Sequence, residues 1–110
     1  MLKRPFSYFL VAAITALLAA GCATAPPVQE MSDARQAIAA AREAGAAARV
    51  PAILQEAEDR LGNAQGYLNR GDSAPNWSLA RREARAAKEI ALEALLRSRE
   101  ARDRESGAAE

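Results

Sequence analysis

Small and apolar side chains recur every three or four positions through most of the chain after residue 30. This repeat is typical of an α-helix that packs along one face. Pro51 interrupts the repeat because proline lacks an N–H and disfavours helical geometry at the residue before it. A second interruption, Gly71 to Pro75, combines a helix-ending glycine with turn residues. The pattern therefore predicts helices over about 32–49, 51–70 and 76–104, with no strand.

Each predicted helix carries one narrow stripe with steps of three and four residues. The first stripe is Ala34, Ile38, Ala41, Gly45 and Ala48; the second is Leu54, Ala57, Leu61, Ala64 and Leu68; the third is Ala80, Ala84, Ala87, Ala91, Ala94, Ser98 and Ala101. Small residues on such a stripe let helix backbones approach closely. We therefore expect an all-α fold, either an antiparallel helical hairpin or a slim three-helix bundle with coiled-coil-like Ala/Leu stripes.

The second and third stripes predict one packing face between neighbouring helices, since short connections favour contact between consecutive helices. Its expected members are Leu54, Leu61 and Leu68 on one helix, and Ala84, Ala87, Ala91 and Ala94 on the other. The alternative is that the alanine stripe binds a separate partner protein.

The composition allows only a thin core. After residue 21 the chain has 24 alanines but only 15 larger apolar residues, and alanine burial contributes little transfer free energy. The chain has no histidine and a single cysteine, which removes the commonest general base and any Cys-rich metal site. The acidic residues Glu56, Glu58 and Asp59 are best interpreted as a solvated helix face. We expect no enzyme activity, no metal site, no soluble cofactor and no small-molecule substrate.

Charge gives no indication of nucleic-acid binding, which usually needs a strongly basic face. The whole chain has 15 basic and 14 acidic residues, and the part after residue 21 has 13 and 14. Acidic residues interrupt the densest basic run, residues 81–89. That run predicts a solvated helix face.

The first 21 residues have the pattern of a bacterial signal peptide. Lys3 and Arg4 precede an uncharged apolar run over residues 6–20. Fifteen helical residues span about 22 Å, which is less than the roughly 30 Å of a bilayer core. The pattern thus favours a removable leader over a stable membrane span.

The end of the leader, Leu18-Ala-Ala-Gly21-Cys22, resembles the bacterial lipobox. The resemblance implies cleavage between Gly21 and Cys22, with diacylglycerol on the Cys22 thiol and an N-acyl lipid such as palmitate on its amine. Two or more acyl chains anchor a protein stably. The residue directly after Cys22 is Ala23 and not an aspartate. In a Gram-negative lipoprotein this implies a location in the inner leaflet of the outer membrane, facing the periplasm.

The lipid-bearing residue is predicted to connect to the folded part through a spacer. Residues 22–30 contain two prolines and no helical repeat, which is typical of a short, semi-stiff linker. The helical domain is expected over 31–105, and residues 106–110 are expected to fray.

The helical part is similar to a family of short bacterial envelope lipoproteins, domain-of-unknown-function family 4398. The segments and residues that carry the resemblance are Asp33–Ile38, Ala44–Ala46, Val50–Leu54, Ala57, Leu61, Ala64 and Leu79–Ala91. The resemblance implies no catalytic residues.

Three functions are compatible with these observations. The first is a lipid-anchored structural or protein-interaction module of the cell envelope, which contacts an envelope protein or associates with itself through its helices. The second is a peptidoglycan-associated or envelope-stress protein that partners an OmpA-like wall-binding protein. The third is a soluble periplasmic helical protein, if the leader is an ordinary signal peptide.

Overall fold

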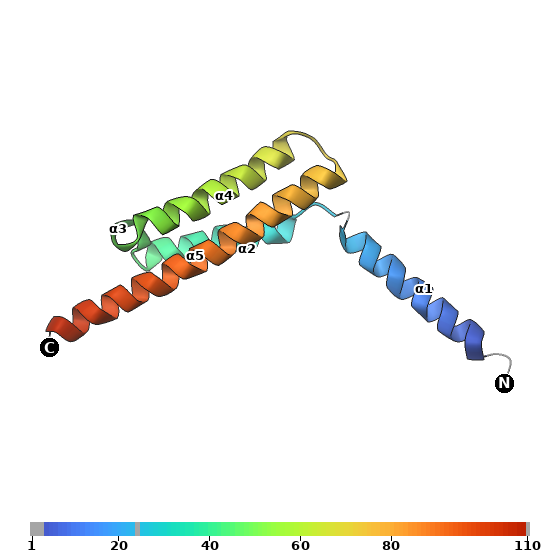
Figure 1. The fold of residues 1–110 in the computed structure, drawn as a ribbon, viewed down its shortest axis with the longest axis horizontal. Helices are drawn as coiled ribbons and strands as arrows, with labels where there is room; N and C mark the ends of the chain where they lie inside the picture. The colour runs from blue at the N-terminus through green and yellow to red at the C-terminus, as the bar shows by residue number, and fades with distance from the viewer. Residues whose placement is uncertain (1–3, 24, 110) are drawn as a thin grey trace.

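The computed structural model describes residues 4–23 and 25–109 of the chain. Within those residues it contains α-helices and no strand, which confirms the all-α fold class. The helices are α1 (Arg4–Ala23), α2 (Val28–Glu43), α3 (Ala46–Arg49), α4 (Pro51–Asn69) and α5 (Ala74–Ala109) (Figure 1).

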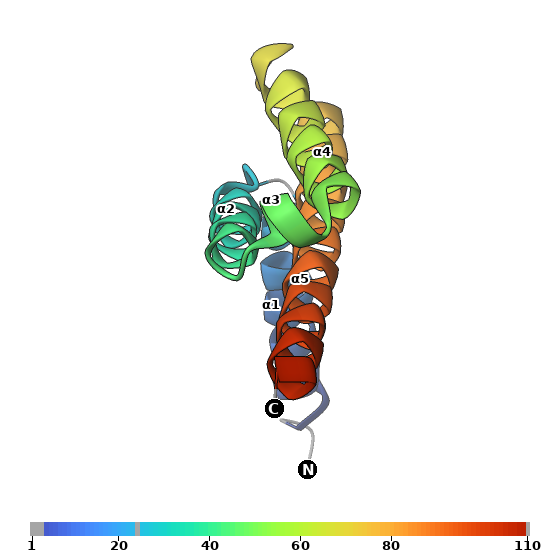
Figure 2. The same cartoon turned by 90° about the vertical axis from the view of Figure 1, so that its left-hand side faces the viewer.

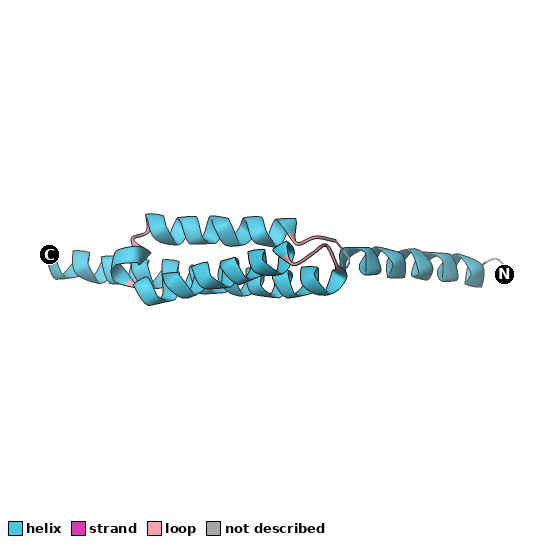
Figure 3. Cartoon of the chain, turned by 90° about the horizontal axis from the view of Figure 1, so that it is seen from above, coloured by secondary structure: helices cyan, strands magenta, loops and turns pink. Residues whose placement is uncertain are grey.

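Helices α2, α4 and α5 form a slim bundle, and α1 points away from it (Figures 1 and 3). Helix α5 lies at the centre of this arrangement because both α2 and α4 pack along it. The chain runs along α4 in the direction opposite to α5, while α2 runs in the same direction as α5. Figure 2, which looks along the long axis of the molecule, shows α2 and α4 set apart from each other beside α5.

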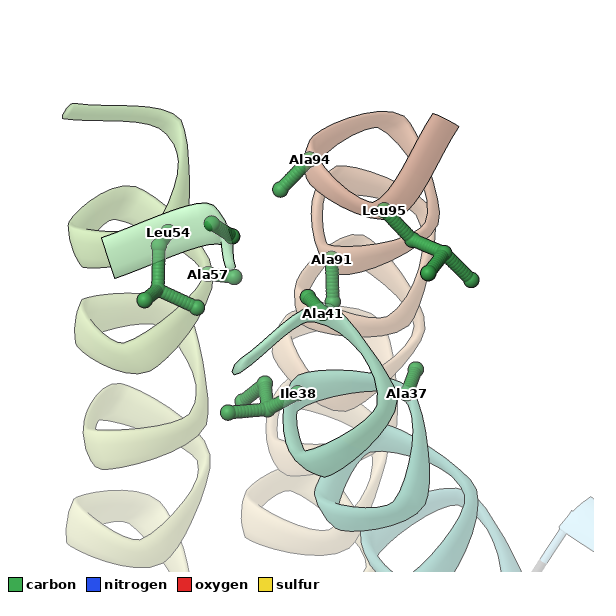
Figure 4. Close-up of a cluster of buried hydrophobic side chains, with 9 residues drawn as sticks. Ala37, Ile38, Ala41, Leu54, Ala57, Ala91, Ala94 and Leu95 are labelled. Atoms are coloured by element: carbon green, nitrogen blue, oxygen red, sulfur yellow. The ribbon is translucent and has the colours of Figure 1, made fainter. Parts of the chain in front are cut away.

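Two apolar clusters hold the bundle together. The first contains Ala37, Ile38, Ala41, Ala46, Leu54, Ala57, Ala91, Ala94 and Leu95, and the second contains Met31, Ala64, Ala80 and Ala84. In Figure 4, Ile38 points from α2 towards α4, and most of the other labelled side chains are alanines. The core is therefore thin, as the composition predicts, and it includes residues of α2 as well as of the hairpin of α4 and α5.

The predicted first helix, 32–49, is two helices in the structure. Gly45 separates α2 from α3 with a φ of 88°, in the left-handed region that favours glycine. The backbone N–H of Gly45 donates to the carbonyl of Arg42, which closes the end of α2. The stripe consequently ends at Ala41: after the turn, Ala46 is fully buried and Ala48 is exposed.

The second predicted helix and the start of the third lie close to their expected bounds. Pro51 occupies the first turn of α4, where its missing N–H has no helical partner to lose. Gly71 follows α4 with a φ of 143°. Ser73 caps α5: its Oγ accepts from the backbone N–H of Asn76 at 3.4 Å, and its carbonyl accepts from Trp77 at 3.0 Å.

The spacer and the tail differ from the expectation. Helix α1 extends through Ala23 and α2 begins at Val28, so the described non-helical residues of the spacer are 25–27. Helix α2 begins early because the buried Met31 and Pro27 bring its first turn onto the bundle. Helix α5 continues to Ala109, through most of the predicted tail, since adding a residue to an existing helix avoids the cost of a new nucleus.

Five large apolar side chains of helix α1 are exposed to solvent. Tyr8, Phe9, Leu10, Val11 and Ile14 are all exposed. No helix in the described ranges has the length and hydropathy that crossing a membrane requires.

Candidate functional site

The alanine stripe of α5 is buried along almost its whole length. Ala80, Ala84, Ala87, Ala91, Ala94 and Ser98 each have no exposed surface, and Ala101 is half-buried. A side chain of one carbon permits the close approach of α2 and α4 to the same stretch of α5. The stripe is thus an internal packing face in this structure, which corresponds to the first of the two interpretations that the sequence allows.

The leucines of α4 meet this stripe at three levels. Leu54 is buried with Ala91 and Ala94. Leu61 is half-buried and contacts both clusters, and Leu68 is half-buried beside the second cluster, which contains Ala84. The structure therefore brings the predicted leucines of α4 together with Ala84, Ala91 and Ala94 of α5. Ala87, which was also predicted, is buried but belongs to neither cluster.

Sequence reasoning missed the contribution of α2 to the same face. Met31, Ile38 and Ala41 of α2 complete the two clusters, together with Ala46 of α3. The repeat of Ala34, Ile38 and Ala41 was visible in the sequence. Nothing in that repeat showed that both α2 and α4 would pack against α5.

One polar group is enclosed within the packing face. Ser98 is fully buried, and its Oγ has no hydrogen-bond partner among the described residues. A buried hydroxyl without a partner destabilises the folded state. The small size of serine, and not its hydroxyl, therefore suits this buried position.

An open groove runs between α2 and α4, where the two helices do not pack closely. Its volume is about 430 Å³. Met31, Ile38 and Leu61 form its apolar part, while Arg35, Arg42, Glu58, Gly62 and Gln65 supply the rest of its lining. Arg42 donates to Glu58 across the groove. The groove is open to solvent and not enclosed.

Two of the acidic residues of α4, Glu58 and Asp59, contact different neighbours. Glu58 pairs with Arg42, and Asp59 accepts a hydrogen bond from Gln55 at 2.9 Å. In the described ranges no group of three or more carboxylate, cysteine or histidine side chains could hold a metal ion.

An ion pair links the α3 segment to the far end of α5. Arg49 Nη2 lies 2.9 Å from Glu105 Oε2. The hydrogen bond from Arg49 lowers the pKa of the Glu105 carboxyl below its ordinary value, and the positive charge of Arg49 adds to that shift. The same hydrogen bond raises the pKa of Arg49. Glu105 is largely exposed and the Arg49 side chain is 26% exposed, so the pair contributes little to the stability of the fold.

Arg81 holds the spacer against the bundle. Its Nε donates to Glu30 Oε1 at 3.0 Å, and its Nη2 donates to the carbonyl of Ala25. Its side chain is only 14% exposed. Because Pro27 is also buried, residues 25–27 are held at the end of the bundle where α2 and α5 begin.

The predicted cleavage and lipidation residues, Gly21 and Cys22, lie in the last turn of α1. The surroundings of these two residues lie outside the described part of the structure.

Comparison with known proteins adds no relative: no family model, no curated protein and no solved structure matches the chain.

Proposed function

We propose that this chain is a lipid-anchored structural or protein-interaction module of the bacterial cell envelope, held by Cys22 and facing the periplasm. The observation that carries the proposal is the position of the single cysteine, directly after small residues at the end of a basic and then apolar leader. On this proposal the module belongs to the inner leaflet of the outer membrane, performs no catalysis and resembles envelope lipoproteins of domain-of-unknown-function family 4398.

The arrangement of α1 supports this proposal. Five large apolar side chains of α1 are exposed, and α2, α4 and α5 enclose their own core without it. Burial in water-free surroundings would be worth roughly 1.5–3 kcal/mol for each such side chain. An apolar helix with no place in the fold is well suited to a leader that is used in a membrane and then removed.

The spacer contacts would hold the lipid-bearing residue beside one end of the bundle. Two residues separate Cys22 from Ala25, whose carbonyl is held by Arg81. The lipid would then lie beside the end of the bundle that carries the 70–75 turn. Tyr67 and Trp77 are half-buried at this end, and the Arg70 guanidinium lies 4.9 Å from the Tyr67 ring. Tyrosine, tryptophan and arginine are all favourable at a lipid headgroup surface.

Metabolic labelling with a palmitate analogue tests the proposal in a Gram-negative host. The full chain should incorporate the label, and Cys22→Ser should lose it and accumulate as an uncleaved precursor. Ala23→Ser is the matched control, because it introduces the same side chain at the adjacent position and should keep the label.

Label that persists in Cys22→Ser would overturn the proposal. Loss of label with normal cleavage to a water-soluble chain would do the same, and would favour an ordinary signal peptide.

A further inference from the structure

Two leucines of α5 remain exposed although they lie beside the core. Leu92 is 39% exposed and Leu96 is 58% exposed, whereas the neighbouring Leu95 is 9% exposed. Leu92 and Leu96 are four residues apart and so occupy adjacent turns of one helix face. Neither α2 nor α4 covers this face. The structure thus leaves a small apolar patch in the middle of its longest helix.

Charged residues extend this patch in both directions along α5. The α5 stripe, as we define it, consists of exposed residues with steps of four, three, four, three and four: Arg85, Glu89, Leu92, Leu96, Arg99 and Asp103. Its signs read positive, negative, apolar, apolar, positive, negative. Read from the other end, the signs are negative, positive, apolar, apolar, negative, positive. Every position is therefore complementary to its counterpart in the reversed stripe.

We propose that the α5 stripe binds a second copy of this chain in an antiparallel, two-fold symmetric pair. Leu92 would pack against the partner's Leu96, and Leu96 against the partner's Leu92. Glu89 would pair with the partner's Arg99, and Arg85 with the partner's Asp103. A self-complementary patch of this kind is what a two-fold interface requires.

The charges of the stripe are available for such contacts. Among the described residues Glu89, Arg99 and Asp103 form no ion pair, and Arg85 has only a long contact of 3.8 Å with Glu30. Glu93 would approach the partner's Glu93 near the symmetry axis. Its Oε1 already lies 2.9 Å from Arg97 Nη2, which offsets that repulsion.

Other arrangements of the two helices are less favourable. A parallel pair in register would place Glu89 against the partner's Glu89 and Arg85 against the partner's Arg85. An antiparallel pair shifted by seven residues would place both leucines against charged residues. Like charges also meet in the proposed arrangement, because Lys88 would lie near the partner's Arg102. We therefore expect a dimer of moderate affinity, to which the ion pairs and the leucines both contribute.

Charge exchange on the full chain, purified in detergent, tests the pairing. Sedimentation equilibrium with the detergent density-matched should give a dimer mass. Glu89→Arg or Arg99→Glu should each weaken the dimer at least about tenfold, because each change acts at both symmetric contacts. The double variant should recover most of the lost affinity, since it restores the opposite charges. Glu43→Arg, the same substitution at an exposed position of α2, is the control and should leave the dimer unchanged.

Cysteine cross-linking tests the antiparallel orientation. Two differently tagged copies should form a disulfide when one carries Glu89→Cys and the other Arg99→Cys. Two copies that both carry Glu89→Cys should not, because ten helical residues would separate the thiols by about 15 Å along the axis.

A monomer mass at all protein concentrations would overturn the proposal. It would also fail if Glu89→Arg left the dimer intact, if the double variant were no tighter than the single ones, or if the Glu89→Cys copies joined to each other in preference to the mixed pair. Far-UV circular dichroism of each variant should match the parent, because every substituted side chain is exposed.

Discussion

Substitution of Ala91 by leucine would test whether the small-residue stripe is an internal packing face. Ala91 has no exposed surface and shares a buried cluster with Ala41 of α2 and Ala57 of α4 (Figure 4). Leucine adds three carbon atoms where three helices meet through single methyl groups. The expected result is a bundle that unfolds more easily because α2 or α4 must move away from α5.

The size of the effect follows from typical overpacking and from the size of the bundle. Overpacking a buried site costs about 1–3 kcal/mol. A bundle of about 80 residues has a total stability of roughly 4–12 kcal/mol. In a domain of this size each 1 kcal/mol shifts the melting temperature by about 4–8 °C. We therefore expect Ala91→Leu to lower the melting temperature by about 8–16 °C for a central loss of about 2 kcal/mol.

Thermal melts of residues 23–110, monitored by circular dichroism, provide the measurement. Ala39→Leu is the matched control, since Ala39 is an exposed alanine in the middle of α2 and should tolerate the same substitution. Equal melting temperatures for the parent, Ala91→Leu and Ala39→Leu would refute the packing argument. They would indicate that the stripe has room to spare and is free to bind another protein.

Three further outcomes follow from individual contacts. Ser98→Ala should raise the stability by about 1 kcal/mol, because it removes a buried hydroxyl that has no partner among the described residues; a lower melting temperature would contradict this. Gly62→Ala should stabilise α4 by about 0.5–1 kcal/mol, because Gly62 has a helical backbone and open space around it. Gly45→Ala should destabilise the protein by about 1–2 kcal/mol, because Gly45 has a positive φ. Denaturant titration of the two variants should give shifts of opposite sign. Because the folded-state pKa of Glu105 is lowered, its contact with Arg49 should persist above the ordinary glutamate pKa and be lost as the pH falls through the lowered pKa. An NMR titration of the Glu105 carboxyl should show the lowered pKa, and Arg49→Ala should abolish the shift.

Much of the fold could be predicted from the sequence because the decisive signals were local. Pro51 can occupy the first turn of a helix, and the run from Gly71 to Pro75 contains a helix-ending glycine and a serine cap. The stripe from Ala80 to Ser98 has no large side chain, so its burial followed directly from helical spacing.

The features that the sequence did not predict depend on tertiary contact. Gly45 fits a helical stripe by spacing alone, and only the folded chain shows that it turns with a positive φ so that Ala46 can enter the core. Leu92 and Leu96 continue the apolar pattern of α5, yet they lie outside the core because α2 and α4 both pack on the opposite side. The contact of Arg81 with Ala25 spans 56 positions and has no local signal.

The candidate site could be predicted only where consecutive residues form a recognisable motif. The leader and Cys22 form such a local motif. The groove between α2 and α4 has no motif, because it arises from the separation of two helices that both pack on α5.

The intact mass of the chain isolated from the envelope of a Gram-negative host tests the central proposal most directly. A lipid-anchored module should begin at Cys22, with a mass that exceeds the 22–110 polypeptide by a diacylglyceryl group and an N-acyl chain. A chain that begins at Met1, or one cleaved elsewhere with a free Cys22 thiol, would contradict the proposal.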